Sequence, residues 1–363
     1  MRSSISSSDP ASPAWRRFLR TAIGAALAIG LALYAFIVVV DPWHTLPLAP
    51  PLPRVPVTSN ARFVFPALAR SPRFDSAIFG TSTSRLLRPA VLDAALGARF
   101  ANLAMNSATS WEQVQLLRVF ARAHPHPRYV MIGLDAMWCQ TKLLYQKKTF
   151  RRFPAWMYRR DLWPGYLHVF NAFALQEAVS EAATMAGFKR RIYGRDGYTD
   201  FTPPESDWTA ARARAHIDAR ADIDFMEDGT PPPHVFPAHA LLVRALAMLP
   251  PSTRKVLFFL PYERAHQGAP GSADAAIWAE CKRRVARIAA ATPETVLADF
   301  MRPSPITDDW RNYWDPMHYR HPIALRLAHD LVRAARGEAA GADDRILVAP
   351  TAVAASEPEA RHD

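Results

Sequence analysis

Cysteine and glycine are scarce in this chain, which has two cysteines, Cys139 and Cys281, and 14 glycines among 363 residues. Two cysteines at this spacing fit no metal-binding motif, and this excludes zinc fingers and cysteine-rich clusters. In an oxidising compartment the pair would form one disulfide, and two inert buried thiols are the alternative. The chain also lacks a glycine-rich phosphate loop, so nucleotide binding finds no support.

Acidic side chains are outnumbered, since 33 Asp and Glu face 44 Lys and Arg, for a formal net charge of +11. The excess is mostly scattered arginine, without a long basic block or an RNA-binding aromatic signature, so we expect no nucleic-acid partner. The 12 histidines include no pair at ligand spacing beside carboxylates, and we expect no metal and no other cofactor. The basic balance suits an anionic membrane surface or an acidic polymer.

Only one long apolar run is present, at residues 21–40, directly after Arg16, Arg17 and Arg20. About 20 apolar residues are enough to cross a bilayer. The preceding arginines predict that residues 1–20 are cytoplasmic and that the chain after Asp41 lies on the outer side of the membrane. A cleaved signal peptide is the alternative, but the run exceeds a signal core and no small-x-small cleavage site follows it. We expect a single-pass anchor.

The segments that flank the expected domain look irregular. Residues 41–60 are rich in proline and predict a stiff, extended linker. Residues 337–363 are rich in Ala, Glu and Asp without periodicity and predict a disordered tail. The folded domain is therefore expected at residues 61–336.

Within that domain short apolar runs alternate with helical patterns, which is typical of an α/β fold with a parallel sheet covered on both faces. Ser82, Asp135 and Pro261 each follow a predicted strand, and in such folds the strands' carboxyl ends meet at one edge. Strands are expected at residues 77–79, 99–104, 129–134, 255–260 and 296–300, and helices at 85–95, 111–123, 275–291 and 323–336.

The alternation lapses at residues 138–237, which we interpret as a helical cap insertion that overhangs the active site as a lid or acceptor-binding surface. Residues 145–173 interleave Trp, Tyr and Phe with Lys and Arg. That mixture also suits a small aromatic core of the insertion's own, or the headgroup region of a membrane.

The segment Asp75–Arg85 is the first candidate for chemistry. Its apolar run breaks at Gly80, which permits a tight turn, and Ser82 then stands at the start of a helical pattern. Backbone N–H groups at a helix N-terminus favour a developing negative charge, although a serine there is also a common N-cap. Ser84 is a rival nucleophile that we expect to point away from the site.

The second candidate is Tyr313–Tyr319, which contains Asp315 and His318 three residues apart. This spacing lets the carboxylate accept a hydrogen bond from one ring nitrogen while the other faces a serine hydroxyl, as nucleophilic catalysis requires. By itself Asp-x-x-His is more often a solvated loop. Its place after the last predicted strand of a sheet whose first strand leads to Ser82 favours catalysis.

The two blocks resemble the SGNH (GDSL) hydrolase superfamily, over residues 74–135 and 255–336. Within it, the chain is similar to membrane-anchored envelope proteins such as the D-alanyl transfer protein of lipoteichoic acid synthesis and the alginate O-acetylation proteins. The resemblance implies a flavodoxin-like three-layer sandwich, with Ser82 as nucleophile, His318 as general base and Asp315 as its orienter. Thr81 replaces the Asp of the Gly-Asp-Ser block.

Two further blocks depart from the family pattern. The oxyanion glycine would be Ser107 or Ala104, within Asn102–Ser107, and Asp135 stands where the third block has an amide. A serine is expected to keep the N–H donor only if it need not take a positive φ. An ionised carboxylate repels an oxyanion, so we expect Asp135 to be protonated, turned toward an arginine, or replaced in function by Asn106.

We also expect a rim residue after the fourth strand, Tyr262 or His266, to contact substrate, with ordinary loop residues as the alternative. The resemblance implies a serine esterase or O-acyltransferase that acts on a cell-envelope polysaccharide or related acyl ester, with a membrane-bound O-acyltransferase as the acyl-supplying partner. The alternatives are a non-catalytic pseudoenzyme that binds polymer or organises a complex, and a lipid esterase.

Overall fold

The computed structural model describes residues 13–55, 57–219, 226 and 229–350. The chain forms two compact units. The first unit comprises residues 1–58 and 161–191, and the second comprises residues 59–160 and 192–363. The chain therefore passes from the first unit to the second, returns, and then completes the second.

In the first unit the main element is α1 (Pro13–Val40), which packs against α8 (Ala172–Met185). Its 28 residues are long and apolar enough to cross a membrane. Most of its side chains are exposed, as a lipid-facing helix requires. The short helix α7 (Gly165–His168) also belongs to this unit, and the Tyr34 hydroxyl donates to the Tyr166 carbonyl at 3.1 Å.

The proline-rich segment after α1 forms no helix or strand among its described residues, but it is not a free spacer. Trp43 donates its indole N–H to the Thr58 hydroxyl at 3.0 Å, and that hydroxyl donates to Glu177 of α8. The backbone N–H of Val55 donates to Glu181, whose side chain is fully buried. The expectation of an extended linker at 41–60 is corrected, because two buried carboxylates of α8 hold this segment.

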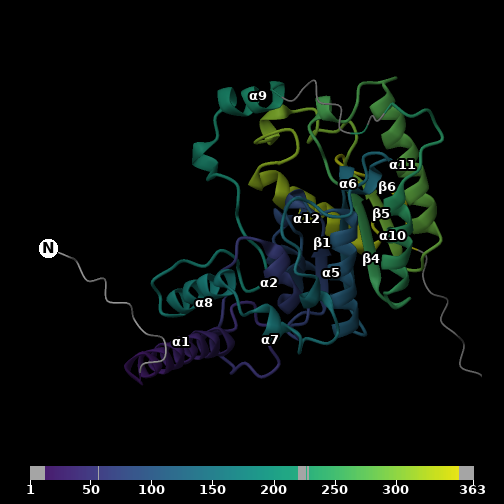
Figure 1. Cartoon of the computed structure of the whole chain (residues 1–363). Coiled ribbons are helices and arrows are strands. Elements are labelled where there is room, and N and C mark those ends of the chain that lie inside the picture. The colour runs from purple at the N-terminus through teal and green to yellow at the C-terminus, as the bar shows by residue number, and fades with distance from the viewer. Residues whose placement is uncertain (1–12, 56, 220–225, 227–228, 351–363) are drawn as a thin grey trace, which may run out of the picture. The chain divides into compact units, whose positions relative to one another are not determined.

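The second unit is built on a six-stranded sheet in the order β2-β1-β3-β4-β5-β6, in which the first five strands are parallel and β6 is antiparallel to β5 (Figure 1). The order reverses between β1 and β3, which is where such sheets open a crevice at the carboxyl ends of their strands. The strands are β1 (Ser76–Phe79), β2 (Phe100–Asn102), β3 (Tyr129–Leu134), β4 (Arg254–Phe259), β5 (Thr295–Asp299) and β6 (Arg345–Val348). The α/β fold with a mostly parallel sheet is confirmed.

Helices cover both faces of this sheet. Neighbouring residues of β1 point to opposite sides, since Ile78 joins the core under α4 and α12 while the Phe79 ring meets Phe120 of α5 at 5.9 Å. On the second face α10 contacts α5 and α11. The helices of this unit are α2 (Ala61–Leu68), α3 (Ser82–Arg85), α4 (Pro89–Leu96), α5 (Ser110–Ala123), α6 (Ala136–Cys139), α9 (Ala210–Asp218), α10 (Pro237–Ala247), α11 (Ala273–Ala290) and α12 (His321–Arg336), with 3-10 turns at Ala155–Tyr158, Glu205–Asp207, Arg264–His266 and Trp310–Asn312.

Three expectations need correction. The helix expected at 85–95 is two helices, because Pro89 lacks an N–H and begins α4 after the single turn of α3. The tail expected to be disordered contributes β6, which pairs with β5, while residues 351–363 lie outside the described range. The insertion at 138–237 is not one cap, since its residues 161–191 belong to the unit of α1.

Candidate active site

Ser82, His318 and Asp315 form one hydrogen-bonded chain, although 236 residues separate the serine from the histidine. His318 Nε2 lies 2.7 Å from Ser82 Oγ, and His318 Nδ1 lies 2.7 Å from Asp315 Oδ2. The imidazole thus contacts the hydroxyl on one side and the carboxylate on the other. This is the geometry of a serine nucleophile with a base and an orienting acid.

Ser82 is delivered by β1 and the turn that follows it. Gly80 has a φ of +152°, and a Cβ there would lie 2.1 Å from the Ser84 hydroxyl, so only glycine fits. Thr81 is the N-cap of α3, and Ser82 is its first helical residue. The expected placement of the serine at a strand-to-helix turn is what the structure shows.

Ser84 points into the protein, as expected. It is fully buried, and its hydroxyl has no hydrogen-bond partner in the described part of the chain. It fills the space left by two glycines, because a Cβ on Gly133 of β3 would lie 2.0 Å from the Ser84 hydroxyl. Ser84 is therefore a packing residue between β1 and β3, and Ser82 is the serine available for chemistry.

The loop before α12 fixes the acid and the base. Asp315 Oδ1 accepts the backbone N–H groups of Met317 and His318 at 2.9 and 3.0 Å, while Oδ2 faces the His318 ring. Burial acts to raise the pKa of Asp315, but the hydrogen bond and charge of His318 and these N–H donors outweigh it, so the pKa is lowered. The carboxylate is held in its charged form beside the imidazole. Phe201 packs edge-on against the His318 ring, at 5.6 Å between centroids.

Asn106 and Ser107 lie beside the serine turn, since the neighbouring Met105 N–H donates to the Gly80 carbonyl at 3.0 Å. Ser107 has a φ of +53°, so the expectation that the donor survives only without a positive φ is wrong, because a serine here adopts the conformation that usually calls for glycine. The N–H groups of Ser82 and Ser107 donate no hydrogen bond to any other described residue. They are free donors of the kind that an oxyanion requires.

Arg62 holds the turn at Asn106 and Ser107, and this role was not predicted from the sequence. Its guanidinium donates to the carbonyls of Asn106 at 3.2 Å and Ser107 at 3.3 Å, and it pairs with the buried Glu112 at 2.6 Å. Because the N–H of a trans peptide points opposite to its C=O, the Ser107 N–H faces away from Arg62. Thr109-x-x-Glu112 is a capping box, and that motif is the one signal from which Glu112 could have been identified.

Asp135 is not turned toward an arginine. It is buried, and it accepts the Thr81 hydroxyl on Oδ2 and the Met137 N–H on Oδ1 at 3.0 Å. Burial raises its pKa to about 6, against the opposing effect of these two hydrogen bonds. Asp135 and Thr81 thus fix the turn after β1 to the end of β3, and neither is free to donate to an oxyanion.

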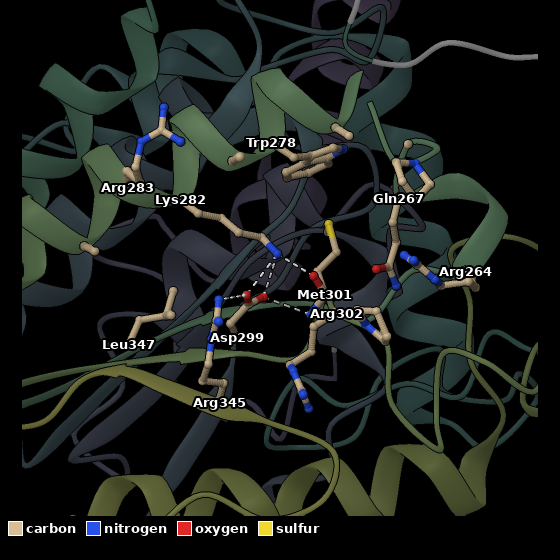
Figure 2. A pocket seen from close by; sticks show the side chains of 16 residues that line it. Arg264, Gln267, Trp278, Lys282, Arg283, Asp299, Met301, Arg302, Arg345 and Leu347 are labelled. Atoms are coloured by element: carbon tan, nitrogen blue, oxygen red, sulfur yellow. Dashed lines mark hydrogen bonds and ion pairs between the residues drawn. The ribbon is translucent and has the colours of Figure 1, made fainter. Parts of the chain in front are cut away.

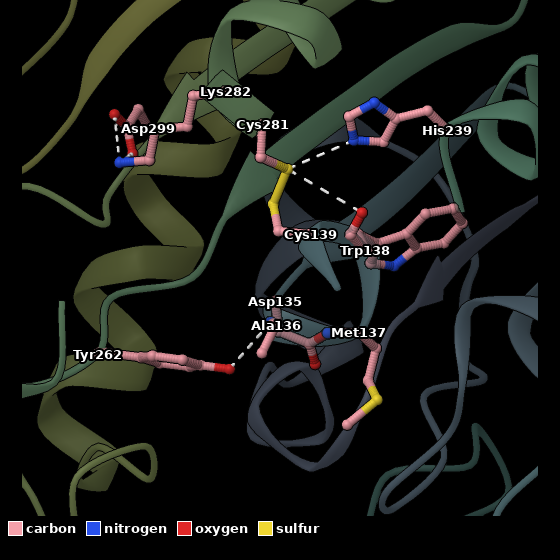
Figure 3. The surroundings of a disulfide bond; sticks show 10 residues. All are labelled: Asp135, Ala136, Met137, Trp138, Cys139, His239, Tyr262, Cys281, Lys282 and Asp299. Atoms are coloured by element: carbon pink, nitrogen blue, oxygen red, sulfur yellow. Dashed lines mark hydrogen bonds and ion pairs between the residues drawn. A yellow bond between two sulfur atoms is a disulfide. The ribbon is translucent and has the colours of Figure 1, made fainter. Parts of the chain in front are cut away.

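The rim residues after β4 are engaged within the protein. Tyr262 is buried, and its hydroxyl accepts the Ala136 N–H at 3.3 Å (Figure 3). His266 is also buried, and its Nδ1 lies 3.2 Å from Glu263. Both side chains are thus buried and engaged within the protein, and a substrate contact by either residue stays a prediction.

Cys139 and Cys281 form a disulfide that joins α6 to α11 (Figure 3). Of the two possibilities left by the sequence, the disulfide is the one observed. It clamps the short helix whose N-cap is Asp135, only four residues from that carboxylate. The bond therefore stabilises the carboxyl end of the sheet, where the candidate site lies.

A basic groove of about 610 Å³ lies along α11, and none of the catalytic candidates lines it (Figure 2). Figure 2 shows Lys282 reaching to Asp299 and to the Met301 carbonyl at its floor. Its basic lining comprises Arg264, Lys282, Arg283, Arg302 and Arg345.

Within the described residues no group of three or more His, Cys, Asp or Glu could hold a metal ion.

The candidate site thus brings together Ser82, His318 and Asp315 and leaves Asn106 and Ser107 beside the serine. Asp135, Thr81 and Tyr262 support the site from within. No family model and no curated protein matches this chain.

Proposed function

We propose that this protein is a membrane-anchored serine esterase or O-acyltransferase of the SGNH type. The observation that carries the proposal is the chain from Ser82 through His318 to Asp315, with both contacts at 2.7 Å. The strand order 2-1-3-4-5 in the parallel part of the sheet is that of flavodoxin-like folds, which supports the superfamily resemblance. Ser82 follows β1, beside the reversal of that order.

The chemistry follows from the positions of these groups. Ser82 Oγ attacks an acyl carbonyl while His318 Nε2 accepts the hydroxyl proton, and Asp315 stabilises the imidazolium that forms. The free N–H groups of Ser82 and Ser107 are the donors for the oxyanion. When the tetrahedral intermediate collapses, His318 returns the proton to the departing alcohol and the acyl group stays on Ser82. A second hydroxyl, from a sugar or from water, then takes the acyl group by the same steps.

We further propose that the acceptor is a cell-envelope polysaccharide and that a membrane-bound O-acyltransferase supplies the acyl group. The resemblance suggests this substrate class, and the net charge of +11 suits an anionic polymer. An esterase acting on a free acyl ester would use the same residues with water as acceptor.

The proposed location is the bacterial inner membrane, with the N-terminus in the cytoplasm and the catalytic unit in the periplasm. Helix α1 is long and apolar enough to span, and Arg16, Arg17 and Arg20 precede its apolar run. The disulfide fits an oxidising compartment. In the unit of α1, the exposed side chains of Trp163, Leu167 and Phe170 suit a membrane surface.

A non-catalytic envelope protein remains the second candidate, because Asp135 occupies the position of an oxyanion amide and only accepts hydrogen bonds. Loss of one oxyanion donor costs about two to three orders of magnitude in rate. Under this alternative the same fold would bind polymer or organise a complex, and Ser82 would not be activated.

The test is labelling of the detergent-solubilised full chain with a fluorescent serine phosphonate. We expect labelling of the wild type and of the matched control Ser84→Ala, none of Ser82→Ala, and labelling at least about 100-fold slower in His318→Ala. Absence of labelling in a wild type with a cooperative thermal unfolding transition would favour the non-catalytic alternative. Unchanged envelope-polymer acylation in a strain carrying Ser82→Ala would contradict the proposed substrate.

A further inference from the structure

Arg85 is a buried guanidinium without a carboxylate partner. It exposes 5% of its surface and lies between two aromatic rings, 5.5 Å from the centroid of Tyr193 and 5.0 Å from that of Phe201. Its Nε has no hydrogen-bond acceptor among the residues that the structure describes. Among the described residues no acidic group forms an ion pair with it.

Arg151 adds a second cation with the same deficit. Its Nε is also buried without an acceptor, and within the described part of the chain it too has no acidic partner. Arg62, which lies in the same region, differs because Glu112 neutralises it at 2.6 Å. The protein therefore supplies a counter-ion to one of these three guanidinium groups and leaves two uncompensated.

This pair lies beside the candidate triad. Arg85 is the fourth residue of α3 and Ser82 the first, and residues three apart lie on the same face of a helix. Phe201 connects the two sites on the other side, since its ring packs against His318 at 5.6 Å and under Arg85 at 5.0 Å. A group bound by Arg85 would be held next to the reacting serine.

Burying an uncompensated charge is expensive, and a guanidinium does not escape the cost by losing its proton near neutral pH. Burial lowers the pKa of Arg85 from its ordinary value; Tyr193 opposes this shift, and the positive charge of Arg151 adds to it. An anion that accepted hydrogen bonds from these groups would remove the penalty. Planar, bidentate recognition of carboxylate and phosphate groups is what guanidinium donors do best.

We propose that Arg85 and Arg151 form an anion subsite adjacent to Ser82, which binds a carboxylate or phosphate group carried by the acyl acceptor. The subsite's role in transfer rests on the proposed function, whereas its ability to bind an anion does not. The anion subsite implies that the acceptor is an acidic polymer, and it places the polymer's charged group within one helical turn of the nucleophile.

A purely structural role for Arg85 is the competing explanation, since cation–π contacts with two rings stabilise a buried guanidinium. Arg88 provides the comparison. It stacks on Tyr198 at 5.1 Å, but it is exposed and its Nε donates to the Tyr198 hydroxyl at 3.2 Å, whereas the buried Nε of Arg85 has no acceptor among the described residues. Replacing Arg88 removes the same charge from the same segment and is the matched control.

The experiment is calorimetric binding to the full chain carrying Ser82→Ala, in uncharged detergent micelles. The ligands are a galacturonate trisaccharide, its uncharged methyl ester and a tri(glycerol phosphate). We expect at least one anionic ligand to bind about tenfold or more tightly than the ester, and both Arg85→Met and Arg151→Gln to weaken that binding about tenfold. Arg88→Gln should leave it unchanged. Tighter binding of the galacturonate trisaccharide would identify a carboxylate as the natural group, and tighter binding of the tri(glycerol phosphate) would identify a phosphate.

The proposal is overturned if neither anionic ligand is preferred over the ester, or if the preference survives in both variants. If Arg85→Met shows no cooperative transition in a thermal melt, the binding measured for Arg151→Gln decides the outcome, because Arg151 is partly exposed. Failure of the proposed function shows itself separately, as absent phosphonate labelling of the wild type. Phosphonate labelling of the wild type without a preference for anionic ligands would support the proposed enzyme and contradict the anion subsite.

Discussion

The Tyr319 hydroxyl donates a hydrogen bond of 2.6 Å to the backbone carbonyl of Thr83. This buried contact joins the residue after His318 to the residue after Ser82. It holds the base and the nucleophile at a fixed separation, although the nucleophile begins α3 and the base lies in the loop before α12. No charged or metal group takes part in this link, so its contribution to geometry can be measured by removing one oxygen atom.

Tyr319→Phe is expected to slow phosphonate labelling by about 10- to 100-fold, because a small displacement of a reacting pair is costly in rate. The Thr83 carbonyl would lose its partner, at a cost of about 1–3 kcal/mol in stability. Labelling rates and thermal melts of the full chain test both effects. The control is Tyr313→Phe, which removes a bond of 3.4 Å to the Pro261 carbonyl and should leave labelling nearly unchanged. Equal labelling of Tyr319→Phe and wild type would refute the positioning role.

Ser107 adopts a left-handed backbone conformation with φ of +53°. Ser107→Gly should retain labelling with little net change in stability, because relief of the strain is offset by the greater freedom of glycine in the unfolded chain. Ser107→Val should lose at least about 1 kcal/mol and label more slowly, since a β-branched residue is least tolerant of this conformation. Equal behaviour of the two variants in melts and labelling would show that the Ser107 backbone is unimportant.

Asp135 offers a test by pH, because its pKa in the folded state is about 6, above the ordinary value of 3.8. The folded protein therefore holds this proton more tightly than the unfolded chain, so stability falls as pH rises from about 4 to 6. Asp135→Asn does not titrate, and its amide can still accept from Met137 and donate to Thr81. Relative to wild type, the variant should gain about 2 kcal/mol between pH 4 and pH 7. Melting curves at the two values measure this gain, and a constant difference would contradict the raised pKa.

The disulfide gives a prediction about stability. Replacing both Cys139 and Cys281 by alanine is expected to cost about 2–5 kcal/mol, because the bond closes a long loop of the unfolded chain. Reductant should lower the melting temperature of the wild type and leave that of the double variant unchanged. A wild type insensitive to reductant, with complete thiol exposure shown by alkylation, would rule out the stabilising role.

Much of the second unit was predictable, because each parallel strand is a short apolar run buried on both faces. Tyr129–Leu134 is an example in which the predicted and observed strands coincide. The β6 strand was missed because Arg345 is exposed and Ile346 and Leu347 are only partly buried, so a strand at the sheet edge carries no burial pattern. The division of the insertion between two units leaves no mark in composition.

The triad residues were predictable because Gly-Thr-Ser and Asp-x-x-His are compact motifs with a known spatial relation in parallel sheets. Arg62 and Glu112 were not, since they meet across 50 positions and an arginine's partner cannot be read from its neighbours. Asp135 was expected to be protonated, turned toward an arginine or replaced in function by Asn106, and the structure shows it as the N-cap of α6 and a partner of Thr81. The difference arises from the direction of the Asp135 side chain at the end of β3, which the sequence does not specify.

Because the unit of α1 is assembled from two stretches of chain, it cannot be separated from the rest by cutting at one place. A soluble fragment that begins at Ser59 would keep α8 but lose Val55 and Thr58, the donors to Glu181 and Glu177. Two buried carboxylates would then be left without their partners, and the face of α8 that packs on α1 would be bare. Proteolytic release from the membrane would therefore damage the protein in a way that an anchor joined by a simple tether would avoid, and fragments made for crystallisation should either retain residues 41–58 or omit residues 161–191 as well.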